Sequence, residues 1–346
     1  MIYKKLGQTD LKTSLICLGT MTFGQQNTEA QAHQQMDMAR DHGINFFDTA
    51  ELYAIPPSSE TQGLTESYIG SWFRKQAQRN NIILASKAAG PGAGWIDHIR
   101  GGPRLNRDHL TRALEASLKR LQTDYIDLYQ IHWPERSTNY FGVLGYQHNA
   151  EEQVIAIEET LEVLNDFIVA GKIRHIGISN ETPWGVMQYL MHAEKNNWPR
   201  IVSIQNPYNL LNRSFEIGLS EMAIREQVGL LAYSPLGFGA LTGKYLNNQQ
   251  PADARLTLFP DYTRYSNENG IAATRAYAKL ARENNLTTTQ LALAFINQQD
   301  FLTANIIGAT NLDQLKENID SVNIKLGEEI IDAINIIHRR YTIPCP

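Results

Sequence analysis

The chain has 346 residues, a net charge of -5, 42% hydrophobic and 19% charged residues. This length fits two average domains or one large α/β barrel, and the composition is typical of a soluble globular protein. The charge, without a dense Lys/Arg block, argues against a nucleic-acid partner. Two cysteines, Cys17 and Cys345, are too few for a disulfide framework or a zinc ribbon. No apolar run could span a bilayer and no signal-peptide core follows Met1, so we expect a cytoplasmic protein without a membrane partner.

The first residues predict a hairpin and then a strand. Ile2–Leu6 and Leu11–Ser14 flank a polar turn, which is typical of a short hairpin. Leu15–Leu18 is the first strong apolar strand and ends at Gly19-Thr20.

Short apolar runs then alternate with helical patterns. Seven more strands are predicted, at Ile44–Phe47, Ile82–Ala85, Tyr125–Ile131, Ile173–Ile178, Ile201–Ile204, Leu230–Tyr233 and Ala304–Ile307. Helices are predicted at Glu29–His42, at Leu64–Gln78, after an Asn106 cap, from Val154 to Gly171, after Thr182-Pro183, at Ile271–Glu283, at Thr288–Gln298, from Leu312 and at Glu328–Arg340.

Eight strands in alternation with helices predict an α/β fold. Continuous apolar strands are typical of parallel sheets buried on both faces, and this count favours a (β/α)8 TIM barrel with an N-terminal β-hairpin and an extra C-terminal helix. We expect one domain over residues 1–346. The alternative is an open sheet, but no Gly-x-Gly-x-x-Gly follows the first strand, which disfavours a Rossmann domain. Insertions at Ala54–Gly63, Ala88–Leu105 and Pro134–Ala150 would crown one end of a barrel, and a polar insertion at Asn247–Asn269 follows later.

Four ionisable residues stand at or just past strand ends: Asp48, Tyr53, Lys87 and His132. Each has an ordinary alternative role: Asp48 could cap a helix, Tyr53 could be a half-buried tyrosine, Lys87 could stand at an exposed strand end and His132 could be a core histidine. Together at one barrel rim they predict a catalytic group, because catalytic residues in barrels come from the ends of several strands. His132 has no partners at ligand spacing, which disfavours a metal-dependent lyase or hydrolase.

These residue types suit proton donation to a carbonyl oxygen. A free tyrosine titrates near about 10, and an adjacent ammonium lowers that pKa. A carboxylate holds the lysine, and a neutral histidine orients the substrate oxygen. No side chain supplies a hydride, so a nicotinamide cofactor is implied.

The same residues lie within longer motifs that resemble the aldo-keto reductases. The resemblance covers nearly the whole chain and rests on Asp48–Tyr53, Lys87, His132, Gly171–Asn180, Gln205–Tyr208, Leu230–Gly237, Gly308–Thr310 and Leu315–Asn318. It is strongest for the branch that includes potassium-channel β subunits. It implies NADPH-dependent reduction of aldehydes or ketones, with Tyr53 as general acid, Lys87 and Asp48 tuning it, and His132 positioning the carbonyl.

The resemblance also implies a cofactor site. Ser179, Asn180 and Gln205 would bind the nicotinamide carboxamide, and Tyr233 would stack on the ring. Ser234, Leu236 and Gly237 would line the pyrophosphate. Thr310, Gln314, Glu317 and Asn318 would hold the adenosine end, and Gly19, Thr20, Met21, Asp48 and Gly308 complete the expected set. The alternatives are that Gln205 only satisfies hydrogen bonds at the strand ends and that Glu317-Asn318 form a solvated helix face.

The choice between NADPH and NADH depends on basic residues. Many relatives place an arginine at the position of Gln314, where it binds the 2′-phosphate of NADP. The channel-subunit branch uses basic residues after the seventh strand instead, and Lys244 and Arg255 stand there. We predict a preference for NADPH, because Arg pairs strongly with phosphate. The alternative to phosphate binding is that Arg255 is merely a solvated loop residue.

The substrate pocket is expected on the loops at the same rim. The loop Ala54–Gly63 and five aromatic residues would form it and would favour a flat or apolar carbonyl compound: Trp95, Trp133, Tyr140, Phe141 and Tyr208. A rival hypothesis is an NADP(H)-occupied regulatory or redox-sensing protein with slow turnover and a protein partner. We expect a monomer or a small homo-oligomer.

Overall fold

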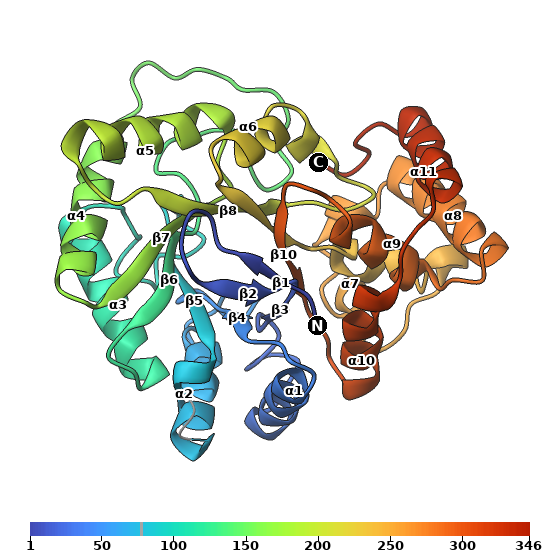
Figure 1. Ribbon diagram of the computed structural model, residues 1–346, viewed down its shortest axis with the longest axis horizontal. Coiled ribbons are helices and arrows are strands. Elements are labelled where there is room, and N and C mark those ends of the chain that lie inside the picture. The colour runs from blue at the N-terminus through green and yellow to red at the C-terminus, as the bar shows by residue number, and fades with distance from the viewer. Residues whose placement is uncertain (77–78) are drawn as a thin grey trace.

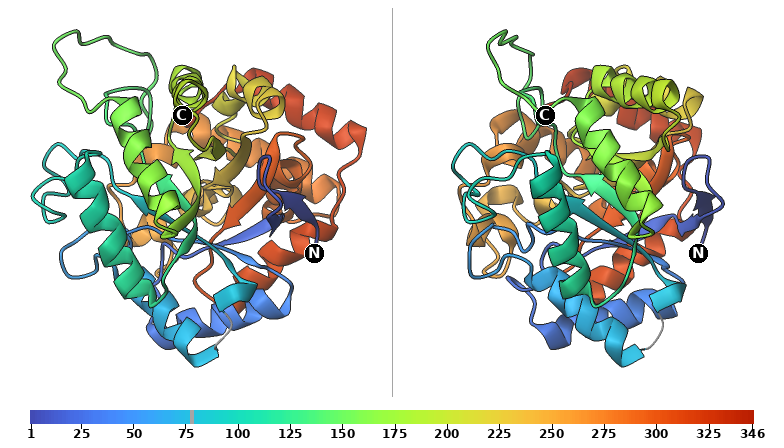
Figure 2. Two further views of the ribbon diagram at one scale, coloured as in Figure 1. Left: turned by 60° about the vertical axis from the view of Figure 1, so that its left-hand side comes forward. Right: turned by 90° about the vertical axis from the view of Figure 1, so that its left-hand side faces the viewer.

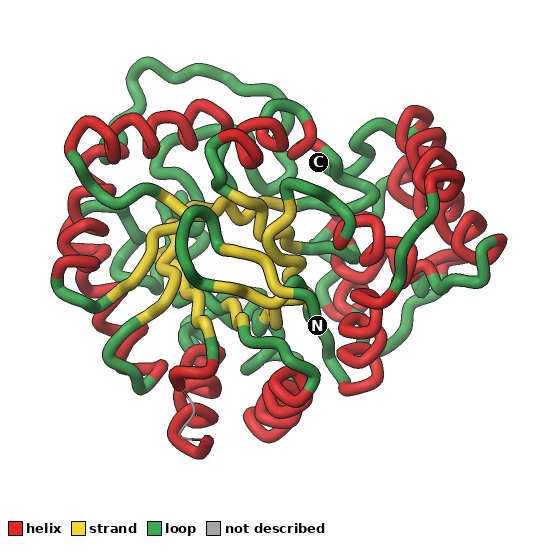
Figure 3. Tube along the Cα trace, viewed as in Figure 1, coloured by secondary structure: helices red, strands yellow, loops and turns green. Residues whose placement is uncertain are grey.

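Eight parallel strands form a closed barrel at the centre of the computed structural model, which describes residues 1–76 and 79–346 (Figures 1 and 3). The strands pair in the order β10-β3-β4-β5-β6-β7-β8-β9. Their bounds are β3 Ile16–Gly19, β4 Phe46–Asp48, β5 Ile83–Ala88, β6 Ile126–Ile131, β7 Ile173–Ser179, β8 Ile201–Pro207, β9 Gly229–Tyr233 and β10 Leu302–Ile307. The predicted (β/α)8 barrel is confirmed, with strand ends displaced by up to three residues.

A short hairpin covers the amino-terminal end of the barrel. Its strands β1 (Tyr3–Lys5) and β2 (Lys12–Ser14) pair antiparallel, as predicted. Leu6 is fully buried in the interior of the barrel. At Gly7, where φ is +57°, a Cβ would lie 2.6 Å from the Val202 carbonyl oxygen. Only glycine therefore allows this turn to lie against the start of β8.

Helices surround the barrel (Figures 1 and 2). None of those in residues 1–76 and 79–346 is long and apolar enough to cross a membrane. Asn106 and Thr182 cap their helices through side-chain oxygens, as predicted. The bounds are α1 Glu29–Asp41, α2 Leu64–Gln76, α3 Arg107–Leu121, α4 Ile157–Val169, α5 Pro183–Asn196, α6 Leu219–Arg225, α7 Arg255–Leu258, α8 Glu268–Glu283, α9 Thr288–Asn297, α10 Leu312–Asp320 and α11 Glu328–Arg340.

Some helices differ from the prediction. The predicted end of α2 at Gln78 lies outside the described residues, and α2 ends at Gln76. Val154 is exposed and precedes α4. The helices α6 and α7 were not predicted, because seven and four residues are too short to show a helical period.

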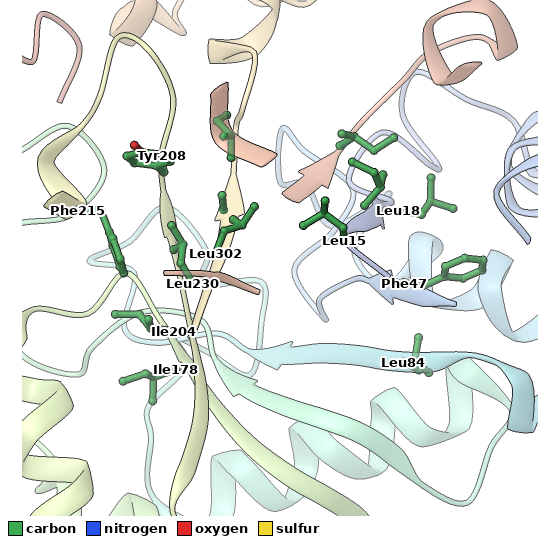
Figure 4. Close-up of a cluster of buried hydrophobic side chains, with 14 of the residues drawn as sticks. Leu15, Leu18, Phe47, Leu84, Ile178, Ile204, Tyr208, Phe215, Leu230 and Leu302 are labelled. Atoms are coloured by element: carbon green, nitrogen blue, oxygen red, sulfur yellow. The ribbon is translucent and has the colours of Figure 1, made fainter. Parts of the chain in front are cut away.

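The two largest hydrophobic clusters lie on the two sides of the barrel wall, and a third, smaller cluster includes Tyr53 and Trp133. Side chains alternate along a strand, so Phe46 faces the barrel interior and Phe47 faces the helices. Leu18, Phe47 and Leu84 come from neighbouring strands and belong to the outer cluster (Figure 4). Burial on both faces explains why the strands are continuous apolar runs rather than alternating ones.

Inside the barrel, the next layer of side chains toward the carboxyl ends of the strands is polar. Asp48, Lys87 and Gln130 each lie two residues beyond an apolar interior residue, namely Phe46, Ala85 and Leu128. The two-residue period places these polar side chains in one layer above the apolar one. This layer forms the floor of the candidate site.

Asp127, on the outer face of β6, is nearly fully buried between two arginines. Its Oδ2 accepts hydrogen bonds from Arg79 at 2.8 Å and from the Leu84 backbone N–H at 3.0 Å. Its Oδ1 accepts one from Arg174 at 3.1 Å. The same two guanidinium groups lie over the Tyr125 ring at 4.2 and 3.9 Å. This network joins β5, β6 and β7 near their amino-terminal ends, away from the candidate site.

Asp127→Ala is expected to lower the free energy of unfolding by about 3 kcal/mol, since it leaves the largely buried Arg79 without its carboxylate and the Leu84 backbone N–H without an acceptor. Urea unfolding measures the change. Asp108→Ala is the matched control, because its 3.2 Å pair with Arg112 is solvent-exposed, and it should cost about 1 kcal/mol or less. Equal effects of the two substitutions would contradict a structural role for the Asp127 network.

Candidate active site

The structure brings Asp48, Tyr53 and Lys87 into one hydrogen-bonded chain. The Lys87 ammonium, which is fully buried, donates to Asp48 Oδ2 at 2.6 Å and to the Tyr53 hydroxyl at 3.2 Å. Its third bond goes to the Thr49 carbonyl oxygen at 2.9 Å. All three donor sites of the ammonium are therefore used, and Asp48 does not serve as a helix cap.

His132 lies beside Tyr53, with ring centroids 5.7 Å apart in an edge-to-face arrangement. Asn180 donates to the His132 carbonyl oxygen at 2.8 Å, which holds the end of β6 against β7. Burial, with a smaller contribution from the Lys87 ammonium, holds the pKa of His132 well below its usual range. The imidazole is therefore neutral near pH 7, as the sequence led us to expect.

The pKa of Tyr53 differs from the expectation. Burial raises it above its ordinary value of 10.0, and the nearby Lys87 ammonium acts in the opposite direction but is outweighed. For Lys87, burial acts to lower the pKa, while Asp48 and then Tyr53 raise it, and the result lies above 10.5. The prediction of a lowered tyrosine pKa was wrong because it left out the dehydration of the phenolate.

Asp48 has two further partners, one of which the sequence analysis missed. Its Oδ1 accepts hydrogen bonds from Gln205 at 2.8 Å and from Gln130 at 3.1 Å. Gln130 was overlooked because it was counted within an apolar strand. A fully buried polar residue two positions before His132 was the available signal.

A cavity of about 1180 Å³ opens above this polar layer. Asp48, Tyr53 and His132 line it, whereas Lys87 lies behind them. Of the predicted cofactor-binding residues, only Gly237 does not line the cavity. Its φ is +53° and a Cβ there would lie 3.1 Å from the Tyr265 ring, so it shapes the turn instead. The lining includes Gly19, Thr20, Met21, Ser179, Asn180, Gln205, Tyr233, Ser234, Leu236, Lys244, Arg255, Gly308, Thr310, Gln314, Glu317 and Asn318.

Two cations stand on the cavity wall without a counter-ion. Lys244 and Arg255 form no ion pair with any carboxylate of residues 1–76 or 79–346. Burial, and then the charge of Arg255, lower the pKa of Lys244, while burial lowers that of Arg255. Two like charges held on one wall suit an anion, and the phosphate groups of a nucleotide cofactor fit this requirement.

The far end of the cavity is formed at the start of α10. The Gln314 side-chain oxygen accepts bonds from the Thr310 backbone N–H at 3.0 Å and from its hydroxyl at 3.1 Å. Thr287 donates to Glu317 at 2.7 Å, and Asn318 donates to the Gly308 carbonyl oxygen at 3.1 Å. Glu317 and Asn318 are thus bonded to the rim and do not form a freely solvated helix face.

Three of the five aromatic residues expected around the substrate line this cavity: Trp95, Trp133 and Phe141. Tyr140 instead lines a neighbouring cavity, beneath the long insertion after β6 that projects from the barrel in Figure 2. Tyr208 was predicted wrongly. It is fully buried, stacks on Phe295 and donates to Glu216 at 2.6 Å, because the chain after β8 turns its ring toward the outer core.

The chain is similar to known proteins over nearly its whole length. The chain is 51% identical to "Protein tas" of Escherichia coli (strain K12) over 346 residues, which is the full length of both chains. It is 35% identical to "Uncharacterized oxidoreductase YrpG" of Bacillus subtilis (97% of this chain, 96% of the relative) and 30% identical to "Probable voltage-gated potassium channel subunit beta" of Arabidopsis thaliana (94% and 92%). Residues 15–339 match the model of the Aldo/keto reductase family. The chain therefore belongs to the aldo/keto reductase family.

Proposed function

We propose that this protein reduces aldehydes or ketones to alcohols with NADPH, and that Tyr53 donates the proton. One observation carries the proposal. A buried chain of hydrogen bonds runs from Asp48 through Lys87 to the Tyr53 hydroxyl, and Tyr53 lines a cavity of about 1180 Å³. This arrangement places a proton donor on the wall of the cavity, as the reduction of a carbonyl requires.

Each side chain has its own role in the reaction. A bound nicotinamide would supply the hydride to the carbonyl carbon. Tyr53 gives its proton to the carbonyl oxygen, and the Lys87 ammonium, 3.2 Å away, stabilises the phenolate that remains. Asp48 keeps Lys87 charged. The neutral imidazole of His132 donates a hydrogen bond that orients the carbonyl oxygen toward Tyr53.

The raised pKa of Tyr53 is compatible with this role. A general acid must hold its proton until the oxyanion forms, and burial keeps the hydroxyl protonated across the physiological range. The developing charge on the substrate oxygen then makes the proton transfer favourable in the transition state.

Single-turnover oxidation of bound NADPH by a panel of carbonyl compounds tests the proposal. Rapid oxidation by at least one aromatic or apolar aldehyde, lost in Tyr53→Phe, would support it. The similarity to a probable potassium-channel subunit favours one rival, a nucleotide-occupied regulatory protein. Slow oxidation by every compound, together with a stable complex with a protein partner, would support that rival instead.

The preference for NADPH has its own test. The double variant Lys244→Met/Arg255→Met is expected to weaken NADPH binding by about 10²-fold or more, because it removes two charge-assisted hydrogen bonds. NADH lacks the 2′-phosphate, so its binding should change by less than about threefold. Fluorescence titration of both cofactors gives the two dissociation constants.

Lys279→Met, in a solvent-exposed pair with Glu283, is the matched control and should leave both constants unchanged. Equal weakening of NADPH and NADH would assign Lys244 and Arg255 to the pyrophosphate that both cofactors share. Comparable turnover of the wild type with the two cofactors at equal low concentrations would contradict the predicted preference.

A further inference from the structure

We propose that Gln130 is a positioning residue that joins the proton-donating side of the site to the side that would recognise the nicotinamide carboxamide. This inference rests on the proposed function. Gln130 is fully buried on β6. In the barrel it lies in register between Lys87 on β5 and Gly177 on β7.

Gln130, Asp48 and Gln205 close a ring of three hydrogen bonds across the barrel interior. Gln130 Nε2 donates to Asp48 Oδ1 at 3.1 Å. Gln205 Nε2 donates to the same oxygen at 2.8 Å and to Gln130 Oε1 at 3.2 Å. The second carboxylate oxygen, Oδ2, is left for Lys87 at 2.6 Å. Asp48 therefore accepts the bonds from Gln130 and Gln205 with Oδ1 and binds Lys87, the partner of the proton donor Tyr53, with Oδ2.

The charge of Asp48 determines how both amides are oriented. An ionised carboxylate only accepts hydrogen bonds, so each glutamine must turn its NH₂ group toward it. Gln130 then presents its oxygen to Gln205, and both N–H groups of Gln205 are used inside the ring. The atom of Gln205 that remains for the cavity is its oxygen, Oε1. That oxygen is suited to accept the N–H of a nicotinamide carboxamide.

The neighbouring strand leaves room for the Gln130 side chain. A Cβ at Gly177 would lie 3.0 Å from Gln130 Cγ and 2.8 Å from Ser203 Oγ. Both distances are tighter than ordinary contacts, so a side chain at position 177 would force Ser203 and Gln130 to shift. Gly177 is thus explained by packing in the polar layer and not by its backbone angles, because its φ is not positive.

Removal of Gln130 should change recognition of the cofactor. Without its oxygen, the second N–H of Gln205 has no acceptor and can turn toward the cavity. Gln205 would then offer a donor that pairs with the carbonyl oxygen of the carboxamide. Asp48 would keep its bonds to Gln205 and Lys87, so the proton donor would stay assembled.

The test compares NADP⁺ with its 3-acetylpyridine analogue. In the analogue an acetyl group replaces the carboxamide, so the carbonyl oxygen is kept but the amide N–H is lost. Wild-type protein is expected to bind NADP⁺ about tenfold more tightly than the analogue, the value of one hydrogen bond to a buried polar group. In Gln130→Met, which has a similar shape and cannot make these bonds, the ratio should fall below about threefold. Quenching of tryptophan fluorescence reports both dissociation constants.

Gln130→Glu provides a second measurement. Its carboxylate still accepts from Gln205 but cannot donate to Asp48, so the binding ratio should stay near the wild-type value. In this variant the new carboxylate stands beside Asp48, and two adjacent carboxylates do not ionise together easily. The pH profile of kcat should therefore show an additional ionisation that is absent from Gln130→Met. A variant that only disturbs packing would show neither the retained ratio nor the added titration.

Asn297→Leu is the matched control for loss of a buried amide. Asn297 bonds to Asn305 and Ser321 outside the barrel and does not line the cavity, so its loss should reduce stability without changing the ratio. An unchanged ratio in Gln130→Met, or no discrimination by the wild type, would overturn the proposal. Binding of oxidised cofactor needs no turnover, so a wild type that reduces no carbonyl would defeat the proposed function without affecting this result.

Discussion

Replacing Tyr53 with phenylalanine is expected to lower kcat by about 10²- to 10⁴-fold, the usual contribution of a general acid, while NADPH binding stays within about threefold of wild type. The substitution removes only the hydroxyl, and the ring keeps its contact with His132. The cofactor-facing residues lose no bond, because within residues 1–76 and 79–346 the hydroxyl pairs only with the Lys87 ammonium, at 3.2 Å. Stopped-flow oxidation of NADPH by a carbonyl substrate, combined with a binding titration, separates the two effects.

Tyr277→Phe is the control for this substitution. Its hydroxyl is also buried, but it lies on α8 and has no hydrogen-bond partner within the described part of the chain. Its removal should leave kcat unchanged. Full activity of Tyr53→Phe would remove Tyr53 from the proposed role and would leave His132 as the remaining candidate donor.

The pH dependence of the wild type follows from the same hydroxyl. Because burial raises the pKa of Tyr53 above 10.0, the acid form persists at neutral pH and is lost only as the pH rises through that higher value. The rate of the chemical step should therefore be flat from about pH 7 to 9 and fall above about pH 10. A fall beginning near pH 7 would indicate that a different group donates the proton.

The sequence predicted the barrel and much of the site for one physical reason. A strand buried on both faces must be apolar along its length, so the aspartate, lysine and histidine at the ends of such runs stood out. Parallel strands bring those ends to the same face of a barrel. Asp48, Lys87 and His132 could thus be grouped without knowledge of any distance between them.

Other features depend on surroundings that the sequence does not display. Gln130 is bonded to residues 82 and 75 positions away in the chain, and nothing in its own segment indicates those partners. Tyr208 follows a strand as closely as Trp133 does, yet its ring faces the outer core. The direction of the Tyr53 pKa depends on how much water the fold excludes, which the motif around it does not reveal.

The second large effect is expected for Lys87→Met, which should lower both kcat and stability. The substitution leaves the buried Asp48 carboxylate without the cation that lies 2.6 Å away. Breaking a buried ion pair from one side costs about 3–5 kcal/mol in the free energy of unfolding. Tyr53 also loses the ammonium that stabilises its phenolate, so kcat should fall by at least about 10²-fold.

The double variant Asp48→Asn/Lys87→Met separates these two losses. It removes both charges, so most of the lost stability should return, whereas kcat should stay low because the ammonium is still absent. Urea unfolding and single-turnover kinetics on the single and double variants complete the cycle. A Lys87→Met protein as stable as the wild type would mean that Asp48 is not charged in the fold, and the proposed division of roles would then fail.

The pH dependence of stability gives an independent check on the charge of Lys87. Its pKa in the folded state lies above the ordinary 10.5, so the folded protein binds the proton more tightly than the unfolded chain does. The ion pair therefore contributes its full stabilisation below about pH 10.5 and loses it as the pH rises through the folded value. Lys87→Met should lack this alkaline loss of stability. If wild type and variant lose stability in parallel above pH 10, other groups cause the decline and the ammonium is not held by Asp48.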